Sequence, residues 1–492
     1  MKVIMARGAL VFSMFMGLAS LIVVHVYGEN SKVGRLPDSP NYDQIHRMQR
    51  IKASFLRRDL VSLPPSSISP SPSYDPPVIL MSSSSRVYHA TSYGADPTGK
   101  TDSTEALLRT ISDAFETPSG GVLIQGIKNL GGTQIHLEGG SYMISRPLRL
   151  PATGGGNLLI HGGSIRASDD FPTDQYLIEL SGSSLPYTYE DITLKDLMLD
   201  SNYKGGAISV INSLRTTIDN CYIAHFSTNG VLVQGGHETY IRNSFLGQHI
   251  TAGGDPGERN FSGTAINLIG NDNAVTDVVI FSAAIGVMVS GQANTLSGVH
   301  CYNKATGWGG IGIYLRLPGL TQTRIVNSYL DYTGIVAEDP VQLHISSTFF
   351  LGDAFILFKS IKGIVNGVNI VDNMFSGSGN GIEIVQLDQS NGPFKAIDEV
   401  VIDRNNVKGM TLKATVARGS TQGNGSSWTV DFNPVLLFPN LIKLVQYSLS
   451  TSKSFPNHAL RNVSGNRVTI ESDIAVPAMV YVMVDQGMVS TS

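Results

Sequence analysis

A small residue followed by a short alternating strand recurs through the middle of the chain. It begins at positions 207, 230, 265, 286, 312, 334, 354 and 381, so the steps are 20 to 35 residues long. A second short apolar segment follows inside most repeats, and no helical pattern lies between the two. Such strands can stack as the coils of a solenoid, each coil burying its apolar residues on the next. The repeat predicts an all-β fold, a right-handed single-stranded parallel β-helix; a β-sandwich would show paired strands every ~8–12 residues.

The repeat occupies only part of the chain, and four regions are expected. Residues 1–28 have the basic start and apolar run of a signal peptide; the run, residues 9–24, is shorter than the ~20 residues of a spanning helix. Residues 29–85 are polar and rich in Pro and Ser, which predicts a solvated tether. Residues 86–410 form the β-helix. In 411–492 the repeat is lost, and alternation predicts a C-terminal antiparallel β-strand region.

The leader and the charge limit where the protein acts and what it contacts. A cleaved signal peptide implies secretion, with no membrane association afterwards, although a signal anchor is the alternative. Three sequons, at Asn260, Asn424 and Asn462, are expected glycosylation sites. The net charge of −4 provides no basic surface for nucleic acid. We expect a monomer.

The strand pattern assigns side chains to the outside of the coils. After each Gly, the first and third residues point inward and the second and fourth outward. Because adjacent coils lie about 4.8 Å apart, Tyr314, Arg316 and Glu338 should cluster on one outer face. A tyrosine ring can pack against a sugar ring, and an arginine can donate two parallel hydrogen bonds to a carboxylate. A surface ion pair between Arg316 and Glu338 is the alternative. Further candidate binding residues are Lys359, His237 and His300, and the rule also places outward Leu232, Gln234, Asn267, Met288, Ser290, Val336, Ile356 and Glu383.

Three segments carry a resemblance to a known family. The stretches YGADPTGKTDSTEALLRTISDAF, GGTQIHLEGGSYMISRPLRLP and GGDPGERNFSGTAINLIGNDNAVTDVVIFS resemble the pectate-lyase-like β-helix superfamily, and within it the plant QUARTET-type polygalacturonases. The resemblance covers the chain from Arg86 onward. It implies a secreted, cofactor-free glycoside hydrolase that cleaves α-1,4-galacturonan, an acidic polysaccharide of the plant cell wall, with a role in pollen separation. The motifs Asn-Thr-Asp, Asp-Asp, Gly-His-Gly and Arg-Ile-Lys of ordinary polygalacturonases are not intact here.

Two places in the repeat offer catalytic carboxylates. Inverting glycosidases hold two carboxyl groups about 6.5–9.5 Å apart. Asp331 and Asp353 stand before consecutive strands, and Asp353 takes the place of the first Asp of the family's Asp-Asp pair; turn capping is the alternative role. The 35-residue step forms a long loop with Asp255 and Glu258, which is the second candidate site.

Two other functions remain open at this point. A lyase on the same fold would hold Ca²⁺ between carboxylates, for which Asp272 and Asp277 beside Asp255 are candidates. A non-catalytic pectin-binding wall protein would explain the broken motifs. No zinc or EF-hand motif is present in the sequence, so we assign no metal site.

The two cysteines give the first testable prediction. Cys221 and Cys301 are assigned to one coil position three coils apart, roughly 14 Å, whereas a disulfide needs Cα atoms within about 7 Å. Both should be buried free thiols. Thiol titration of the denatured, unreduced protein should find two reactive groups; none, together with a cross-linked peptide in mass spectrometry, would contradict this coil assignment.

Overall fold

The computed structural model describes residues 86–487, apart from 117, 119, 125, 183–186, 250–261, 303–309 and 453. The expected signal peptide and tether, and also Asp255, Glu258 and Asn260, lie outside the described residues. The described residues all belong to one compact unit, Ser82–Ser492. Among them, no helix is both long and apolar enough to cross a membrane.

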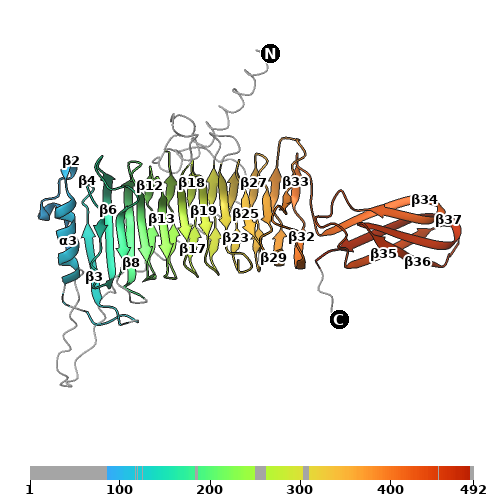
Figure 1. Ribbon diagram of the computed structural model, residues 1–492, viewed down its shortest axis with the longest axis horizontal. Coiled ribbons are helices and arrows are strands. Elements are labelled where there is room, and N and C mark those ends of the chain that lie inside the picture. Colours follow the sequence, from blue (N-terminus) through green and yellow to red (C-terminus); the bar gives the residue numbers. More distant parts are fainter. Residues whose placement is uncertain are drawn as a thin grey trace, which may run out of the picture. The chain divides into compact units, whose positions relative to one another are not determined.

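The coils of a parallel β-helix make up most of the described chain (Figure 1). Each complete coil places one strand on each of three faces, which we number in chain order. Face 1 is the ten-stranded sheet formed by β5 (Leu148–Arg149), β7 (Tyr176–Ser181), β9 (Gly206–Ile211), β13 (Asn229–Gln234), β16 (Thr264–Leu268), β19 (Ile285–Val289), β22 (Ile311–Leu315), β25 (Ile335–Glu338), β28 (Ile356–Lys359) and β31 (Val385–Asp388).

Faces 2 and 3 are joined into one sheet by β6 (Gly155–Ala167) and β8 (Tyr189–Asp200), which run through both. Face 2 contains β11 (Thr217–Asp219), β14 (Tyr240–Arg242), β17 (Ala274–Thr276), β20 (Thr295–Ser297), β23 (Arg324–Val326), β26 (His344–Ser346), β29 (Ile364–Val371) and β32 (Ala396–Asp403). Face 3 contains β12 (Tyr222–Ala224), β15 (Phe245–Gly247), β18 (Val279–Phe281), β21 (His300–Tyr302), β24 (Tyr329–Asp331), β27 (Phe349–Leu351), β30 (Met374–Ser376) and β33 (Asn406–Lys408).

The N-terminal part of the β-helix contains further elements, and a helix packs against it. The amphipathic helix α3 (Thr104–Glu116) buries Ala106, Leu107, Ile111 and Ala114, the apolar stripe of its sequence, against the β-helix core. Asp102 accepts a hydrogen bond from the backbone N–H of Thr104 at 2.9 Å and so caps its first turn. The other elements here are β1 (Val87–His89), η2 (Ala90–Tyr93), β2 (Thr98–Asp102), β3 (Asn129–His136), β4 (Ser141–Ile144) and β10 (Ser213–Leu214).

An unbroken apolar ladder inside face 1 holds the coils together. Its members follow one another in register, and each is at most 1% exposed: Ile208, Val231, Ile266, Val287, Ile313, Ile335, Ile356 and Val385. Burying one such side chain is worth about 1.5–3 kcal/mol. The predicted fold class is therefore confirmed, including the C-terminal antiparallel sheet described below.

The inward–outward rule was right for the five repeats that begin at positions 230, 265, 286, 312 and 334, and wrong for the last two. Ile356 points inward, and Leu357 and Lys359 take the outward positions of β28. Glu383 precedes β31, whose outward residues are Gln386 and Asp388. The reason is turn length: three residues separate β24 from β25, four separate β27 from β28, and eight separate β30 from β31. The small residue that begins the repeat thus loses its fixed place in the coil.

The C-terminal sheet has its own core. The coil strands end with β33 at Lys408, and β34 (Val416–Asp431) begins an antiparallel sheet of order β34-β37-β35, with β36 paired to β37. The remaining bounds are β35 (Leu444–Thr451), β36 (His458–Ser464) and β37 (Arg467–Asp485). One side of this sheet buries Trp428, Val430, Phe432 and the even-numbered valines of β37.

Both cysteines are free and buried, as predicted. Burial raises the pKa of each thiol to about 12, so both behave as small apolar groups. The coil position was partly wrong, however. Cys301 is in register with Ile280 and, through the intervening coils, with Ile223, whereas Cys221 precedes β12. The two sulfurs are three coils apart but offset by two positions along the coil.

One buried aspartate ties two coils together and gives a prediction about stability. Asp339 is 0% exposed, and its carboxylate accepts the backbone N–H groups of residues 361–364. Asp339→Asn turns one acceptor oxygen into a donor, so we expect a loss of about 2 kcal/mol or more, measured as a lower urea midpoint.

Asp372→Asn is the matched control. Asp372 also has a positive φ, 58°, but its carboxylate pairs with Arg404 at the surface. Its urea midpoint should stay at the wild-type value, because exposed ion pairs contribute little. Equal midpoints for both variants would show that the Asp339 hydrogen bonds do not hold the coils.

Candidate active site

The outer side of face 1 carries a cluster of interacting polar side chains. Glu338 at the end of β25 is only 7% exposed. Tyr314, from β22, donates its hydroxyl to Glu338 Oε1 at 2.6 Å, and Lys359 Nζ lies 3.8 Å from the same oxygen. The expected clustering of Tyr314 with Glu338 is therefore confirmed. In the described chain the ion-pair partner of Glu338 is Lys359, not Arg316.

Tyr314 is held in its protonated form. Burial, and then the hydrogen bond to Glu338, raise the pKa of Tyr314 to about 12. The exposed Arg316 acts in the opposite direction, so its guanidinium stands close enough to influence this ring. The phenol is thus a permanent donor that orients the Glu338 carboxylate, while Arg316 remains accessible from solvent.

A second carboxylate extends the same row. Glu338, Lys359 and Asp388 follow one another in register on β25, β28 and β31. Two strand spacings put the two acidic positions about 9–10 Å apart, at the upper limit of the separation in inverting glycosidases. Hydrogen bonds from Ser390, backbone and side chain, lower the pKa of Asp388, and Lys359 contributes further. Asp388 therefore remains ionised in mildly acidic solution.

Asp388 was missed by the sequence analysis. The repeat was traced through Gly381, which assigned the outward position to Glu383 instead of Asp388. Glu383 in fact pairs with Lys413 at 3.3 Å. The available signal was the last residue of GIEIVQLD, Asp388, an acid at the end of the strand segment as Glu338 is in GIVAE.

A polar ladder continues on earlier coils of face 1. Asn229 donates to the Tyr176 hydroxyl at 2.7 Å, and Asn267 donates to Asn229 Oδ1 at 3.3 Å. The Tyr176 ring lies over Gly206, where a Cβ would come within 2.3 Å of it. Asn267 Oδ1 is buried without a hydrogen-bond partner among the described residues. Face 1 thus presents amides and phenols over several coils, as a polymer-binding surface requires.

The aspartates expected to be catalytic do not share one register. Asp331 ends β24 on face 3, where it is in register with Leu351. Asp353 lies in the turn after β27 and accepts the backbone N–H and hydroxyl of Ser378 at 2.8 and 2.6 Å. The geometry therefore supports the turn-capping role for Asp353.

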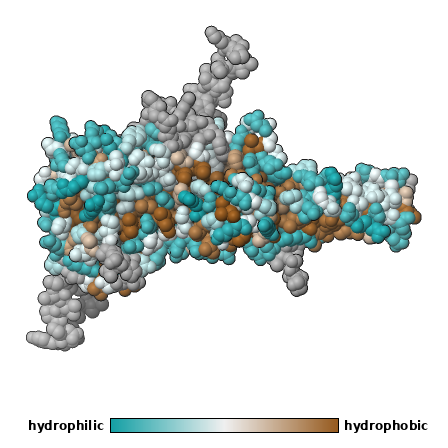
Figure 2. Space-filling view, viewed as in Figure 1, coloured by the Kyte–Doolittle hydropathy of each residue, from teal (hydrophilic) through white to brown (hydrophobic). Residues whose placement is uncertain are grey.

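The two histidines are also apart. His237 follows β13 in the turn toward face 2 and packs against Tyr187, with ring centroids 5.5 Å apart. His300 lies on face 3, two coils further on, 4.4 Å from the Tyr329 ring, and burial lowers its pKa. The expectation that the two histidines lie on neighbouring coils is therefore wrong. His300 belongs to a partly exposed row of face 3 that includes Phe245, Phe349 and Met374. Figure 2 shows such hydrophobic patches among polar residues along the β-helix.

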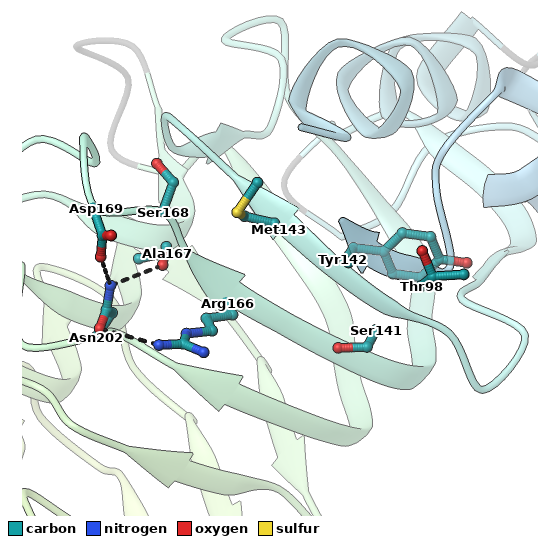
Figure 3. A pocket seen from close by; sticks show the side chains of 10 residues that line it. Thr98, Ser141, Tyr142, Met143, Arg166, Ala167, Ser168, Asp169 and Asn202 are labelled. Carbon is teal, nitrogen blue, oxygen red and sulfur yellow. Dashed lines mark hydrogen bonds between the residues drawn. The ribbon is translucent and has the colours of Figure 1, made fainter. Parts of the chain in front are cut away.

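A separate cavity of about 360 Å³ opens at the end of the first face 3 strands (Figure 3). Asn202 lies between Arg166 and Asp169, and donates to Asp169 Oδ1 at 3.0 Å. Arg166 also stands 3.5 Å from Asp200, whose carboxylate in addition pairs with His225 at 2.7 Å and accepts the backbone N–H of Asn202 at 2.9 Å. Burial is the largest single effect and would raise the pKa of Asp200, but the hydrogen bonds from His225 and Asn202 and the charges of His225 and Arg166 together outweigh it, so the pKa is lowered. Arg166 and Asp200 are in register, but both precede position 207, where the recognisable repeat begins, so the sequence pattern did not reveal this network.

The candidate metal ligands and the described sequon residues lie in turns and on exposed strands. Within the described ranges, no group of three or more His, Cys, Asp and Glu side chains could hold a metal ion. Asp272 and Asp277, the candidate calcium ligands, occupy turns with φ of 56° and 53°. The sequon residues Asn424 and Asn462 are exposed on β34 and β36.

Comparison with known proteins identifies the family. The chain is 65% identical to polygalacturonase QRT3 of Arabidopsis thaliana over 479 residues, 96% of this chain and 98% of that protein. No family model matches. Among solved structures, ORF18 of Geobacillus virus E2 aligns over 92% of this chain and 83% of its own at 11% identity, with a TM-score of 0.53, a likeness of fold alone. The endo-xylogalacturonan hydrolase of Aspergillus tubingensis covers 66% of this chain and 92% of its own, at 12% identity and a TM-score of 0.48. By its identity and coverage with QRT3, the chain belongs to the family of this plant polygalacturonase.

Proposed function

We propose that the protein hydrolyses α-1,4-galacturonan on the outer side of face 1. Membership of the QRT3 family supports the substrate and the reaction. The observation that carries the site is the in-register row Glu338–Lys359–Asp388, which puts a cation between two carboxyl positions about 9–10 Å apart. The N-terminal leader pattern supports action outside the cell, in the wall.

The chemistry assigns one role to each carboxyl group. Asp388, ionised because its pKa is lowered, removes a proton from water, whose oxygen bonds to the anomeric carbon. Glu338 enters the reaction protonated on the oxygen that does not accept the Tyr314 hydroxyl, and it gives this proton to the glycosidic oxygen as the old carbon–oxygen bond breaks. The products are a new reducing end and a shortened chain. Lys359 and Arg316 bind uronate carboxylates, and Tyr314 orients Glu338.

One assay separates the candidate reactions. Polygalacturonate is digested with and without EDTA, and both reducing ends and ultraviolet absorbance of unsaturated products are recorded. Reducing ends without absorbance are expected for hydrolysis. EDTA-sensitive absorbance would indicate β-elimination with calcium, and neither signal would indicate a pectin-binding wall protein.

The assigned carboxylates should be essential for turnover. Glu338→Gln and Asp388→Asn should each lower kcat by at least ~100-fold, because a positioned proton-transfer group is worth that much. The melting temperature of Glu338→Gln should stay near the wild-type value, whereas Asp388→Asn weakens the bonds from Ser390 and should lower the melting temperature about as much as Asp353→Asn does.

Asp331→Asn and Asp353→Asn are the comparison variants. They keep turnover if face 1 is the site, and Asp353→Asn loses stability because its bonds to Ser378 are weakened. If these two lose turnover while the face 1 variants remain active, the site lies at the edge of face 3. Loss on Asp255→Asn or Glu258→Gln alone would move it to the long loop.

Arg316 should act in binding more than in chemistry. Arg316→Ala should raise KM on polygalacturonate by roughly tenfold, and more than it lowers kcat, because a charge-assisted bond to substrate is lost. Arg324→Ala removes an exposed cation from the same coil on face 2 and should leave KM unchanged. An unaltered KM in Arg316→Ala would mean that Arg316 does not touch the uronate.

A further inference from the structure

The C-terminal sheet exposes one side whose composition differs from that of an ordinary sheet surface. Its other side buries the valines of β37 against Trp428 and Phe432. On the exposed side, Tyr481 stands in the central strand and is 50% exposed. Both of its cross-strand neighbours are serines, Ser420 on β34 and Ser448 on β35.

The serines leave Tyr481 half exposed. Aromatic residues in sheets usually pack against aromatic or β-branched cross-strand partners, and such pairs stabilise the sheet. Serine side chains are too short to cover a phenol ring, so this sheet forgoes that contact. An uncovered tyrosine offers an apolar ring face and a hydroxyl, the combination that contacts sugar rings in water.

The next row supplies the polar partners. Arg418, Met483 and Gln446 are in register one step along the same side of the sheet. Together with Ser448 and Tyr481, these residues line a shallow depression of about 360 Å³. We call these five residues the C-terminal surface.

The charge of this surface favours an anion. Arg418 is exposed, and the described chain shows no hydrogen bond or ion pair for its side chain. The carboxylate on the same side, Asp485, already accepts the backbone N–H of Gly487 at 2.6 Å. The Arg418 guanidinium is thus available as a two-pronged donor, the geometry that matches a carboxylate.

We propose that the C-terminal surface binds an acidic polysaccharide chain, separately from face 1. A uronate ring lies on Tyr481, its carboxylate pairs with Arg418, and its hydroxyls reach Gln446 and Ser448. The choice of a polyuronate over a neutral glycan rests on Arg418 and on the proposed function. When face 1 and the C-terminal surface bind the same polymer, the second binding event is intramolecular. The protein therefore binds long chains with higher avidity than short ones.

The test measures how much of the full-length protein is retained on immobilised polygalacturonate under conditions in which the polymer is not hydrolysed. Tyr481→Ala and Arg418→Ala should each weaken retention, and the double variant should weaken it about tenfold or more. Hydrolysis of a soluble galacturonate trimer should be unchanged, because a trimer is too short to engage both surfaces. Ser448→Glu, which places a negative charge beside the ring, should have the same effect with the tyrosine intact.

Two control variants remove the same groups elsewhere. Tyr240→Ala takes away an exposed tyrosine of face 2, and Arg461→Ala an exposed arginine of β36. Wild-type retention in the double variant and in Ser448→Glu, or an equal loss in the controls, would overturn the proposal. An equal loss on an immobilised neutral glucan would overturn the acidic ligand. A wild-type protein that binds but does not hydrolyse would contradict the proposed function and leave the binding result valid.

Discussion

In-register stacking of parallel strands is the interaction on which the whole β-helix depends. Every coil bonds to the next through its backbone and adds one apolar side chain to the ladder that runs from Ile208 to Val385. Because the ladder is fixed, the residues that alternate with it along each face 1 strand must point outward, and equivalent positions on successive coils stand about 4.8 Å apart. The scaffold thus converts residues far apart in sequence into rows of side chains with a set spacing.

The candidate active site is one such row, and its geometry depends on the turns. Glu338, Lys359 and Asp388 are 21 and 29 residues apart, yet they become consecutive neighbours because the extra residues lie in turns of different length. Because the apolar ladder inside the coils is constant and the turns between the strands vary in length, the chain can place functional groups on the surface without disturbing the core. The same arrangement explains why long loops are tolerated between coils.

The carboxyl groups on this scaffold fall into two classes, those that hold turns and those that stand on the candidate site. The carboxylates of Asp339 and Asp353 are taken up by backbone N–H or hydroxyl groups of the next coil, so they hold turns. Glu338 receives a phenol and lies near an ammonium group, on a face otherwise suited to a polymer. Proximity to a strand end does not distinguish the two classes, and neither does a bond from a serine, because Asp388 also accepts the backbone N–H of Ser390 in its own turn. Glu338 and Asp388 differ from Asp339 and Asp353 in standing in one outward row of face 1.

The sequence by itself determined the solenoid, the inward ladder as far as Ile335, the free cysteines and the closeness of Tyr314 to Glu338, because each follows from a local period of alternating residues. It did not determine the positions of Ile356, Glu383 and Asp388, because turn length shifts the start of each strand and no local pattern records that shift. The network of Arg166, Asp200 and His225 lay equally beyond it. Only the tertiary structure, through hydrogen bonding between coils, decided which residues share a register.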